Sequence, residues 1–421
     1  MKKVALTLAS VMAAAAFAPE ASAIPSFARQ TGMACSACHQ QHYPVLNGFG
    51  QAFKAAGYTM MGAQEKVEGE HLSIPGVLNA SMLLKARYQQ TNGNAAASDK
   101  ADNTGKAVAG SSTNSGQWQI PDEFSLFLGG RVGDNGALKM GFMFEGNTAA
   151  AGALVAGFKM PVVIDTDSVK FLVIPYMTDA LGTSYGFEQS STGAVRGVRW
   201  AEHRKEISAQ QYIGTDGAAT GIAFVGVHEM GYINVSRWSP NFTASAGTGA
   251  VAFTSNYIRA AVTPTVAGWA INAGVQSWSG ENHTEASGAY TLVKNEATAV
   301  DFQAFGQVGG NDLGVYATYA TAPKTSGTIA NGFNGGAFDK TAMTVGADYS
   351  VIPHTLHLGA AYRSATNNAN KSDNAITLMA IYDLTQNVVL QINTSTYSGD
   401  AYNGTPANGT ALTTFLLEAA W

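Results

Sequence analysis

The chain has 421 residues and a formal net charge of −5 at pH 7, and only 13% of its residues are charged, whereas 47 are glycine. A soluble domain normally carries about 25% charged residues, so the composition argues against an ordinary soluble surface. The acidic balance and the lack of basic runs in the sequence exclude nucleic acid as a partner.

The N-terminal segment, residues 1–23, has the pattern of a secretory signal. Lys2 and Lys3 precede an apolar run from Val4 to Phe17, and Ala21-Ser22-Ala23 precedes Ile24. The run is too short for a membrane-spanning helix, which needs about 20 apolar residues. We therefore predict cleavage after Ala23 and export of the remaining chain.

The most specific motif is Cys35-Ser36-Ala37-Cys38-His39, which contains both cysteines of the chain. C-x-x-C-H is the attachment signature of c-type haem: two thioethers fix the porphyrin, and the adjacent histidine ligates the iron. Two alternatives are a zinc ion held with His42 as a fourth ligand and a simple Cys35–Cys38 disulfide. The sequence predicts one covalent haem c.

Residues 24–75 read as a small helical module around this motif. A helix is predicted to begin near Pro44 and to end at Gly57, with Phe49 and Phe53 at helical spacing. These two rings are predicted to form a wall against the haem, or else to pack on protein. About 50 residues cannot enclose a porphyrin, so the rest of the chain is expected to cover it.

The sequence indicates the other candidate haem contacts less specifically than the cysteine motif. Arg29 and Lys54 are predicted to pair with the propionates, or else to be solvated. The sixth iron ligand is predicted to be Met60, with Met61 and His71 as alternatives, because His42 lies too close to His39 to reach the opposite face. The remaining histidines are interpreted as strand or loop residues: His203, His228, His283, His354 and His357.

From residue 76 onward, the sequence alternates with period two, as in β-strands. Short links at 309–312, 351–355 and 383–387 alternate with long polar connections at 321–340, 364–374 and 398–410. This sorting of turns and loops is typical of a transmembrane antiparallel β-barrel with its short turns in the periplasm. Residues 76–421 are therefore predicted to form a porin-like outer-membrane barrel.

The number of strands follows from the length of this region. At about 9–11 residues per tilted strand, we expect 14 to 18 strands and favour an even count of about 16. Residues 91–117 are predicted to be a long exposed loop. The clearest earlier strands are Leu78–Tyr88, Ile120–Val132, Ala137–Glu145, Val169–Pro175, Glu206–Tyr212, Gly221–Asn234, Ala267–Trp278 and Asp301–Val308.

The last segment, Ala411–Trp421, alternates in the same way and ends on an aromatic residue. Thr413, Phe415 and Leu417 are predicted on one face, and Thr414 and Glu418 on the other. Such an ending resembles the signal read by the outer-membrane barrel assembly machinery. It places the C-terminus in the periplasm and the long loops outside the cell.

The module resembles one known family, the fused outer-membrane monohaem cytochrome–porins of iron(II)-oxidising bacteria. The matching residues are Pro25, Phe27-Ala-Arg-Gln-Thr-Gly32, Cys35, Cys38-His39, Pro44, Leu46-Asn47, Phe49-Gly50, Phe53-Lys54 and Gly57-Tyr58. The remaining residues agree with the family in architecture and length only. The resemblance implies a 16-stranded porin with the cytochrome module in or at its lumen.

The resemblance also implies a function: oxidation of extracellular Fe(II) at the haem and transfer of electrons to a periplasmic c-type cytochrome. Glu145 and Glu229 could attract ferrous ions, although nothing in the sequence singles them out. Two alternatives stay open, a conduit for another extracellular donor or acceptor and a solute-diffusion porin with an accessory haem module.

Overall fold

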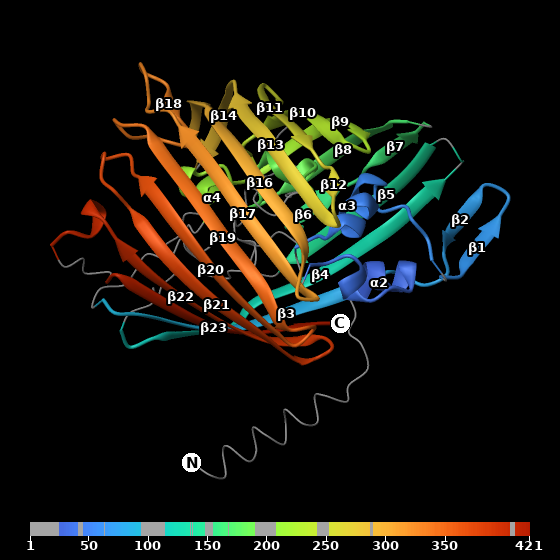
Figure 1. Cartoon of the computed structure of the whole chain (residues 1–421). Helices are drawn as coiled ribbons and strands as arrows, with labels where there is room; N and C mark the ends of the chain where they lie inside the picture. Colours follow the sequence, from blue (N-terminus) through green and yellow to red (C-terminus); the bar gives the residue numbers. More distant parts are fainter. Residues whose placement is uncertain are drawn as a thin grey trace, which may run out of the picture.

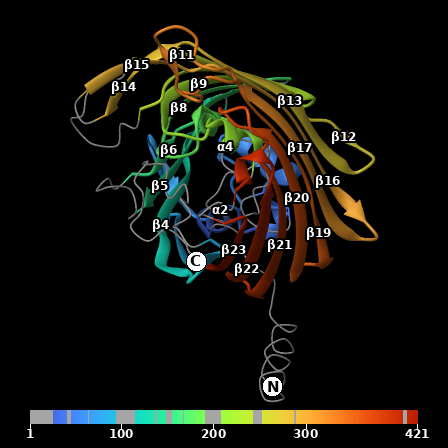
Figure 2. The ribbon, with the colours of Figure 1, turned by 90° about the vertical axis from the view of Figure 1, so that its left-hand side faces the viewer.

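The strands of the computed structural model form a closed antiparallel β-barrel (Figures 1 and 2). The structure describes residues 25–40, 45–62, 64–93, 114–134, 136, 138–147, 155–166, 168–189, 208–241, 252–286, 289–404 and 409–421. The predicted signal segment lies outside these residues, as do 94–113, the central part of the predicted loop at 91–117. No helix within the described ranges is long and apolar enough to cross a membrane.

Eighteen strand segments make up the barrel among the described residues. Segments β6 and β7 share one position between β5 and β8, and β11 and β12 share one between β10 and β13, so the barrel has sixteen strands. Strand β23 closes the barrel on β3, with Phe415 opposite Tyr88. The prediction of an all-β barrel of about 16 strands is confirmed.

The segments in chain order are β3 (Ala80–Thr91), β4 (Gln117–Asp134), β5 (Leu138–Asn147), β6 (Gly157–Lys159), β7 (Val162–Asp165), β8 (Lys170–Thr178), β9 (Ala219–His228), β10 (Gly231–Ser239), β11 (Ser255–Val262), β12 (Thr265–Val266), β13 (Trp269–Ser279), β16 (Ala297–Val308), β17 (Asn311–Ala322), β19 (Lys340–Ile352), β20 (Leu356–Thr366), β21 (Asn374–Thr385), β22 (Val388–Ser398) and β23 (Ala411–Ala420).

The two faces of the barrel wall differ in polarity, as period two requires. On β23, Phe415 and Leu417 point outward and are exposed, whereas Thr414 and Glu418 point inward and are buried. Inward charges are paired, for example Arg259 Nη2 with Asp301 Oδ1 at 2.6 Å. The predicted faces of the last strand are therefore confirmed.

The connections alternate in length around the barrel. Short turns follow β4, β7, β9, β12, β16, β19 and β21, and longer connections follow the intervening strands. Because neighbouring strands are antiparallel, all short turns lie at one end, which we call the short-turn end. Strand β23 also ends there, as the alternation in the sequence predicted.

Two predicted strands are wrong. The described part of Glu206–Tyr212 is the start of a short helix, α4 (Ala209–Ile213), because Ser208 caps its first turn and Gly214, at φ 94°, ends it. The segment Gly221–Asn234 is not one strand but the hairpin of β9 and β10, whose turn is Glu229 and Met230. The apolar alternation continues on both sides of this turn, which hides it in the sequence.

Smaller elements complete the chain. The hairpin of β1 (Lys66–Gly69) and β2 (Leu72–Pro75) projects from the barrel (Figure 1). A second sheet on the long-loop side contains β14 (Glu281–Ala286), β15 (Ala289–Lys294) and β18 (Ala330–Asn331). The short 3₁₀ helices are η1 (Cys35–Ala37), η2 (Thr183–Gly186) and η3 (Asp400–Tyr402).

The N-terminal module contains two α-helices instead of the single predicted one. Helix α2 (Pro25–Thr31) precedes the cysteine motif, and α3 (Gly48–Ala55) follows it. Helix α3 begins four residues after the predicted start, because Asn47 caps it by accepting a hydrogen bond from the backbone N–H of Gly50. Pro44 lies outside the described residues.

Candidate functional site

The N-terminal module lies against the inner wall of the barrel near the short-turn end, where α2 is seen within the ring of strands (Figure 2). Ser26 Oγ is 2.7 Å from Ser81 Oγ, and the guanidinium of Arg29 donates to the carbonyl of Ala80, the first residue of β3. Gly48 on α3 faces Ala270, the second residue of β13. These contacts hold the module to strands far apart in the sequence.

The buried side chain of Gln30 makes hydrogen bonds both within the module and to the barrel wall. The side-chain amide of Gln30 donates to the carbonyls of Tyr58 and Met60, at 2.7 and 2.8 Å. Its oxygen accepts from the backbone N–H of Arg131 on β4, at 3.2 Å. A buried amide with these partners fixes the orientation of α2 relative to the wall.

Glycines allow the module to approach the wall closely. A Cβ atom on Gly141 of β5 would lie 1.9 Å from the carbonyl oxygen of Gly57, and one on Gly129 of β4 would lie 2.9 Å from the ring of Phe27. Gly57 itself has φ 64° and contacts Val163 of β7. The module can therefore dock this closely only because these positions are glycines, which have no Cβ atom.

The cysteine motif forms a compact loop anchored on α3. The backbone N–H groups of Cys38 and His39 donate to the carbonyl of Cys35, at 3.0 and 2.9 Å. The side-chain amide of Asn47 donates to the carbonyls of Ser36 and Ala37, at 3.2 and 3.1 Å. One residue thus caps α3 and ties that helix to the motif.

Gly50 completes this packing between the loop and α3. A Cβ atom there would lie only 2.1 Å from the carbonyl oxygen of Cys38, so a larger residue would push the helix away from the motif. The resemblance matched this glycine and Asn47 without giving them a role. The structure explains both as supports of the motif.

The imidazole of His39 has a defined orientation. Its Nδ1 lies 3.1 Å from the carbonyl oxygen of Val45, and a carbonyl can only accept. Nδ1 therefore carries the hydrogen, which places the lone pair on Nε2. Histidines that bind metals usually make such a bond through their other ring nitrogen.

Cys35 and Cys38 are not joined by a disulfide bond, and both are partly buried. Burial raises the pKa of the Cys35 thiol to about 12, with a further contribution from the carboxylate of Asp383, and burial also raises the pKa of Cys38. Without a bound group, both thiols are therefore protonated at neutral pH.

The described residues contain no cluster of three or more metal-ligating side chains, and His42, the fourth ligand of the zinc alternative, lies outside them. Cys35, Cys38 and His39 fit the attachment of a c-type haem, because two unbridged cysteines and an oriented imidazole share one short loop. When bound, such a haem supplies one-electron redox chemistry.

The predicted aromatic wall divides into two different environments. Phe53 is buried and packs on Phe27 and Tyr58, with ring centroids 5.2 and 5.9 Å from its own, so it belongs to the interior of the module. Phe49 is exposed on α3. The predicted role of both rings beside a haem stays a prediction.

The other candidate residues have identifiable positions. Lys54 donates to the carbonyl of Glu188, and Arg29 to that of Ala80, so both predicted propionate partners bind backbone oxygens. Met60 and Met61 follow α3, and the side chain of Met60 is 37% exposed. His71 lies in the turn between β1 and β2 with 93% of its side chain exposed.

An apolar patch on the inner wall lies beside the motif, and the sequence did not single it out. Val45, whose carbonyl orients His39, is buried in one cluster with inward residues of five strands. These are Phe305, Tyr316, Ala361, Met379, Ile381 and Val389. The period-two pattern showed that such residues alternate but not which of them face a ligand site.

A second insertion into the lumen comes from the connection between β8 and β9, of which residues 179–189 and 208–218 are described. Helix α4 contacts β17 and β19, and Tyr212 donates to Asp373 Oδ2 at 3.1 Å, near the long-loop end. Gln189 donates to the carbonyl of Gln51 on α3 at 3.1 Å. The two insertions therefore touch inside the barrel.

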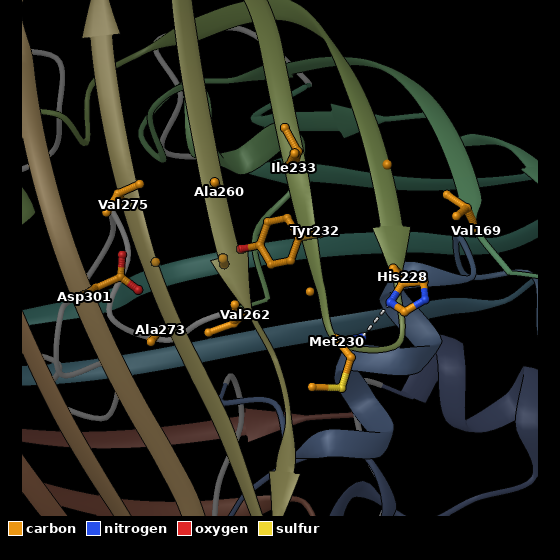
Figure 3. Close-up of a pocket in the computed structure, with 14 residues that line it drawn as sticks. Val169, His228, Met230, Tyr232, Ile233, Ala260, Val262, Ala273, Val275 and Asp301 are labelled. Carbon is orange, nitrogen blue, oxygen red and sulfur yellow. Dashed lines mark hydrogen bonds between the residues drawn. The ribbon is translucent and has the colours of Figure 1, made fainter.

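A hollow of about 730 Å³ lies in the wall formed by β9, β10, β11 and β13 (Figure 3). Its lining is mainly small or apolar, and the one hydrogen bond in this view runs from the backbone N–H of Met230 to His228 Nδ1, at 3.2 Å. The hollow brings together no set of reactive side chains.

No protein-family model and no curated protein matches the chain. Among solved structures, OmpT, an outer membrane protein of Vibrio cholerae, is 12% identical over 85% of this chain and 100% of its own, with a TM-score of 0.47. An anion-selective porin from Comamonas acidovorans is 15% identical over 82% of this chain and 99% of its own, also at 0.47. At these values the likeness carries no argument about function.

Proposed function

We propose that this protein is an outer-membrane electron conduit: a porin-like barrel whose lumen holds one covalent haem c. The haem would be attached through Cys35 and Cys38 and ligated by His39. In this proposal the protein is an oxidoreductase-like electron carrier of the fused cytochrome–porin family.

The observation that carries the proposal is the orientation of His39 inside the barrel. The Val45 carbonyl makes Nδ1 the donor, so in the neutral ring the lone pair lies on Nε2, as in histidines that ligate metals. Asn47 and Gly50 hold both cysteines in the same loop. This combination of residues on one loop inside the barrel supports a haem-binding role.

The wall of the barrel supports a membrane location. Apolar side chains face outward on successive strands, whereas several charged side chains face inward and form ion pairs, as expected when lipid surrounds the barrel. Short turns lie on the periplasmic side of such barrels. This orientation puts the C-terminus and the module on the periplasmic side and the long loops outside the cell.

The donor in this proposal is extracellular Fe(II), and the acceptor is a periplasmic c-type cytochrome. Ferric iron is poorly soluble near neutral pH, so moving only the electron inward would keep the mineral product outside. Cys35, Cys38 and His39 would hold the haem near the short-turn end, and helix α4 of the insertion between β8 and β9 lies toward the other end. Another extracellular donor or acceptor would use the same path.

A second candidate is a solute-diffusion porin with an accessory haem module. The closed barrel of sixteen strands favours it, because barrels of this size can leave an aqueous channel. The two touching insertions favour the conduit, because they occupy the lumen. Solute uptake by liposomes that contain the protein separates the two: ready passage of sugars would contradict the conduit.

The proposed reaction is tested by stopped-flow mixing of the purified haem-loaded protein with Fe(II) while the haem absorption bands are recorded. We expect reduction of the haem at neutral pH. As controls, Cys35→Ala and Cys38→Ala should each lose normal covalent attachment of the haem. A wild-type haem that Fe(II) does not reduce would remove Fe(II) as the donor, and covalent haem in a Cys35→Ala,Cys38→Ala variant would contradict the site.

A further inference from the structure

One histidine of the barrel wall is buried without a hydrogen bond. His357 on β20 points into the lumen with 1% of its side chain exposed, and neither ring nitrogen has a hydrogen-bond partner among the described residues. An imidazole always has at least one N–H group to satisfy, and burying it unsatisfied costs about 1–3 kcal/mol. Such a residue calls for a partner beyond the described part of the chain.

The neighbours of His357 are those of the cysteine motif. In the barrel sheet, His357 pairs with Ile381 of β21, and Ile381 packs in the same apolar cluster as Val45, which orients His39. Asp383, two residues along β21, acts on the pKa of the Cys35 thiol. The unpartnered imidazole and the motif therefore share one part of the lumen.

The carboxylate of Asp383 lies close enough to the imidazole of His357 to orient it. His357 Nε2 lies 3.7 Å from Asp383 Oδ2, which is slightly beyond hydrogen-bond distance. Histidines that bind metals commonly donate their second ring N–H to a carboxylate, which fixes the tautomer and strengthens the ligand. A small shift would give this arrangement with Nδ1 as the ligating atom.

We propose that His357 is the sixth ligand of the iron of the haem attached at Cys35 and Cys38. The inference rests on the proposed function, since it requires a haem at this motif. It replaces Met60, which is partly exposed, with a buried donor that has no hydrogen-bond partner among the described residues. The barrel would then supply one axial ligand and the module the other, so that the barrel itself completes the haem site.

The test is spectroscopy of the purified, haem-loaded full chain. We expect a six-coordinate, low-spin ferric haem in the wild type, with a near-infrared band typical of two histidine ligands. His357→Ala should become high-spin and should bind added imidazole with return of the low-spin spectrum. His354→Ala, in the neighbouring turn, is the matched control and should keep the wild-type spectrum.

Three results would overturn the assignment. A low-spin spectrum in His357→Ala that is unchanged from the wild type excludes His357, as does a high-spin spectrum in Met60→Ala that imidazole restores. If His357→Ala cannot be recovered as a barrel, a histidine–methionine band in the wild type decides against the assignment, and a bis-histidine band supports it. If the protein carries covalent haem but one of these results is obtained, only the assignment of His357 fails and the proposed function stands. If the protein carries no covalent haem, both the assignment and the proposed function fail.

Discussion

The two insertions in the lumen differ in what holds them and in what they carry. The N-terminal module docks through polar contacts and close glycine approaches, such as the Gln30 amide and Gly141. The insertion between β8 and β9 adds to its hydrogen bonds a large cluster of buried apolar side chains, including Phe187 and Ile213. The first insertion contains the cysteine motif, Cys35–His39.

The contacts indicate different roles for the two insertions: the N-terminal module is positioned precisely, and the insertion between β8 and β9 fills the lumen. Polar and glycine contacts specify one position and orientation, which a cofactor site requires. Apolar packing fills space and excludes water with less demand on geometry. The lumen would therefore contain a precisely placed module on the short-turn side and a filler on the long-loop side.

The largest expected effect follows from removing the filler. Replacing residues 181–216 by a short glycine–serine turn should raise sugar uptake into liposomes by at least about tenfold, because a barrel of this size otherwise leaves a channel. Covalent haem content should not change, since the motif lies on the other insertion. Unchanged uptake would show that the module alone closes the lumen.

A smaller effect should follow from disturbing the module. Gly141→Ala forces a Cβ atom against the carbonyl of Gly57, and overpacking of this kind costs about 1–3 kcal/mol. We expect a lower thermal midpoint and faster proteolysis of residues 25–62. Gly133→Ala on β4 is the matched control, because nothing lies within 4 Å of its Cβ position. Equal behaviour of the two variants would contradict tight docking.

The smallest effect concerns the thiols in protein prepared without haem. Because burial raises the pKa of Cys35 to about 12, its thiol should stay protonated at neutral pH. Its alkylation rate should rise about tenfold per pH unit through the alkaline range up to that value. Mass spectrometry after timed alkylation measures this, and a rate that levels off near pH 9 would show an exposed thiol.

The barrel was predictable from the sequence because its period and its loop lengths are local properties. The faces of β23, the count of about sixteen strands and the end that holds Trp421 all follow from alternation and parity. Two strands were wrong for physical reasons: a Ser208 cap and Gly214 form α4 within a buried segment, and apolar alternation continues through the turn between β9 and β10.

The candidate site was predictable only within the cysteine motif. Cys35, Cys38 and His39 lie within one motif, so their spacing indicates their chemistry. The contacts of Val45, Gly141 and His357 join residues that are far apart in the chain and meet only when the barrel closes around the module. His357 therefore looked like an ordinary strand residue.

The central claim is that electrons cross this barrel while solutes do not. It is tested most directly in liposomes that contain the haem-loaded protein, with Fe(II) outside and an oxidised soluble c-type cytochrome trapped inside. The account predicts reduction of the internal cytochrome without sugar uptake, and loss of that reduction in Cys35→Ala. No internal reduction by wild-type protein with full haem content, or sugar passage at the rate of an open porin, would contradict it.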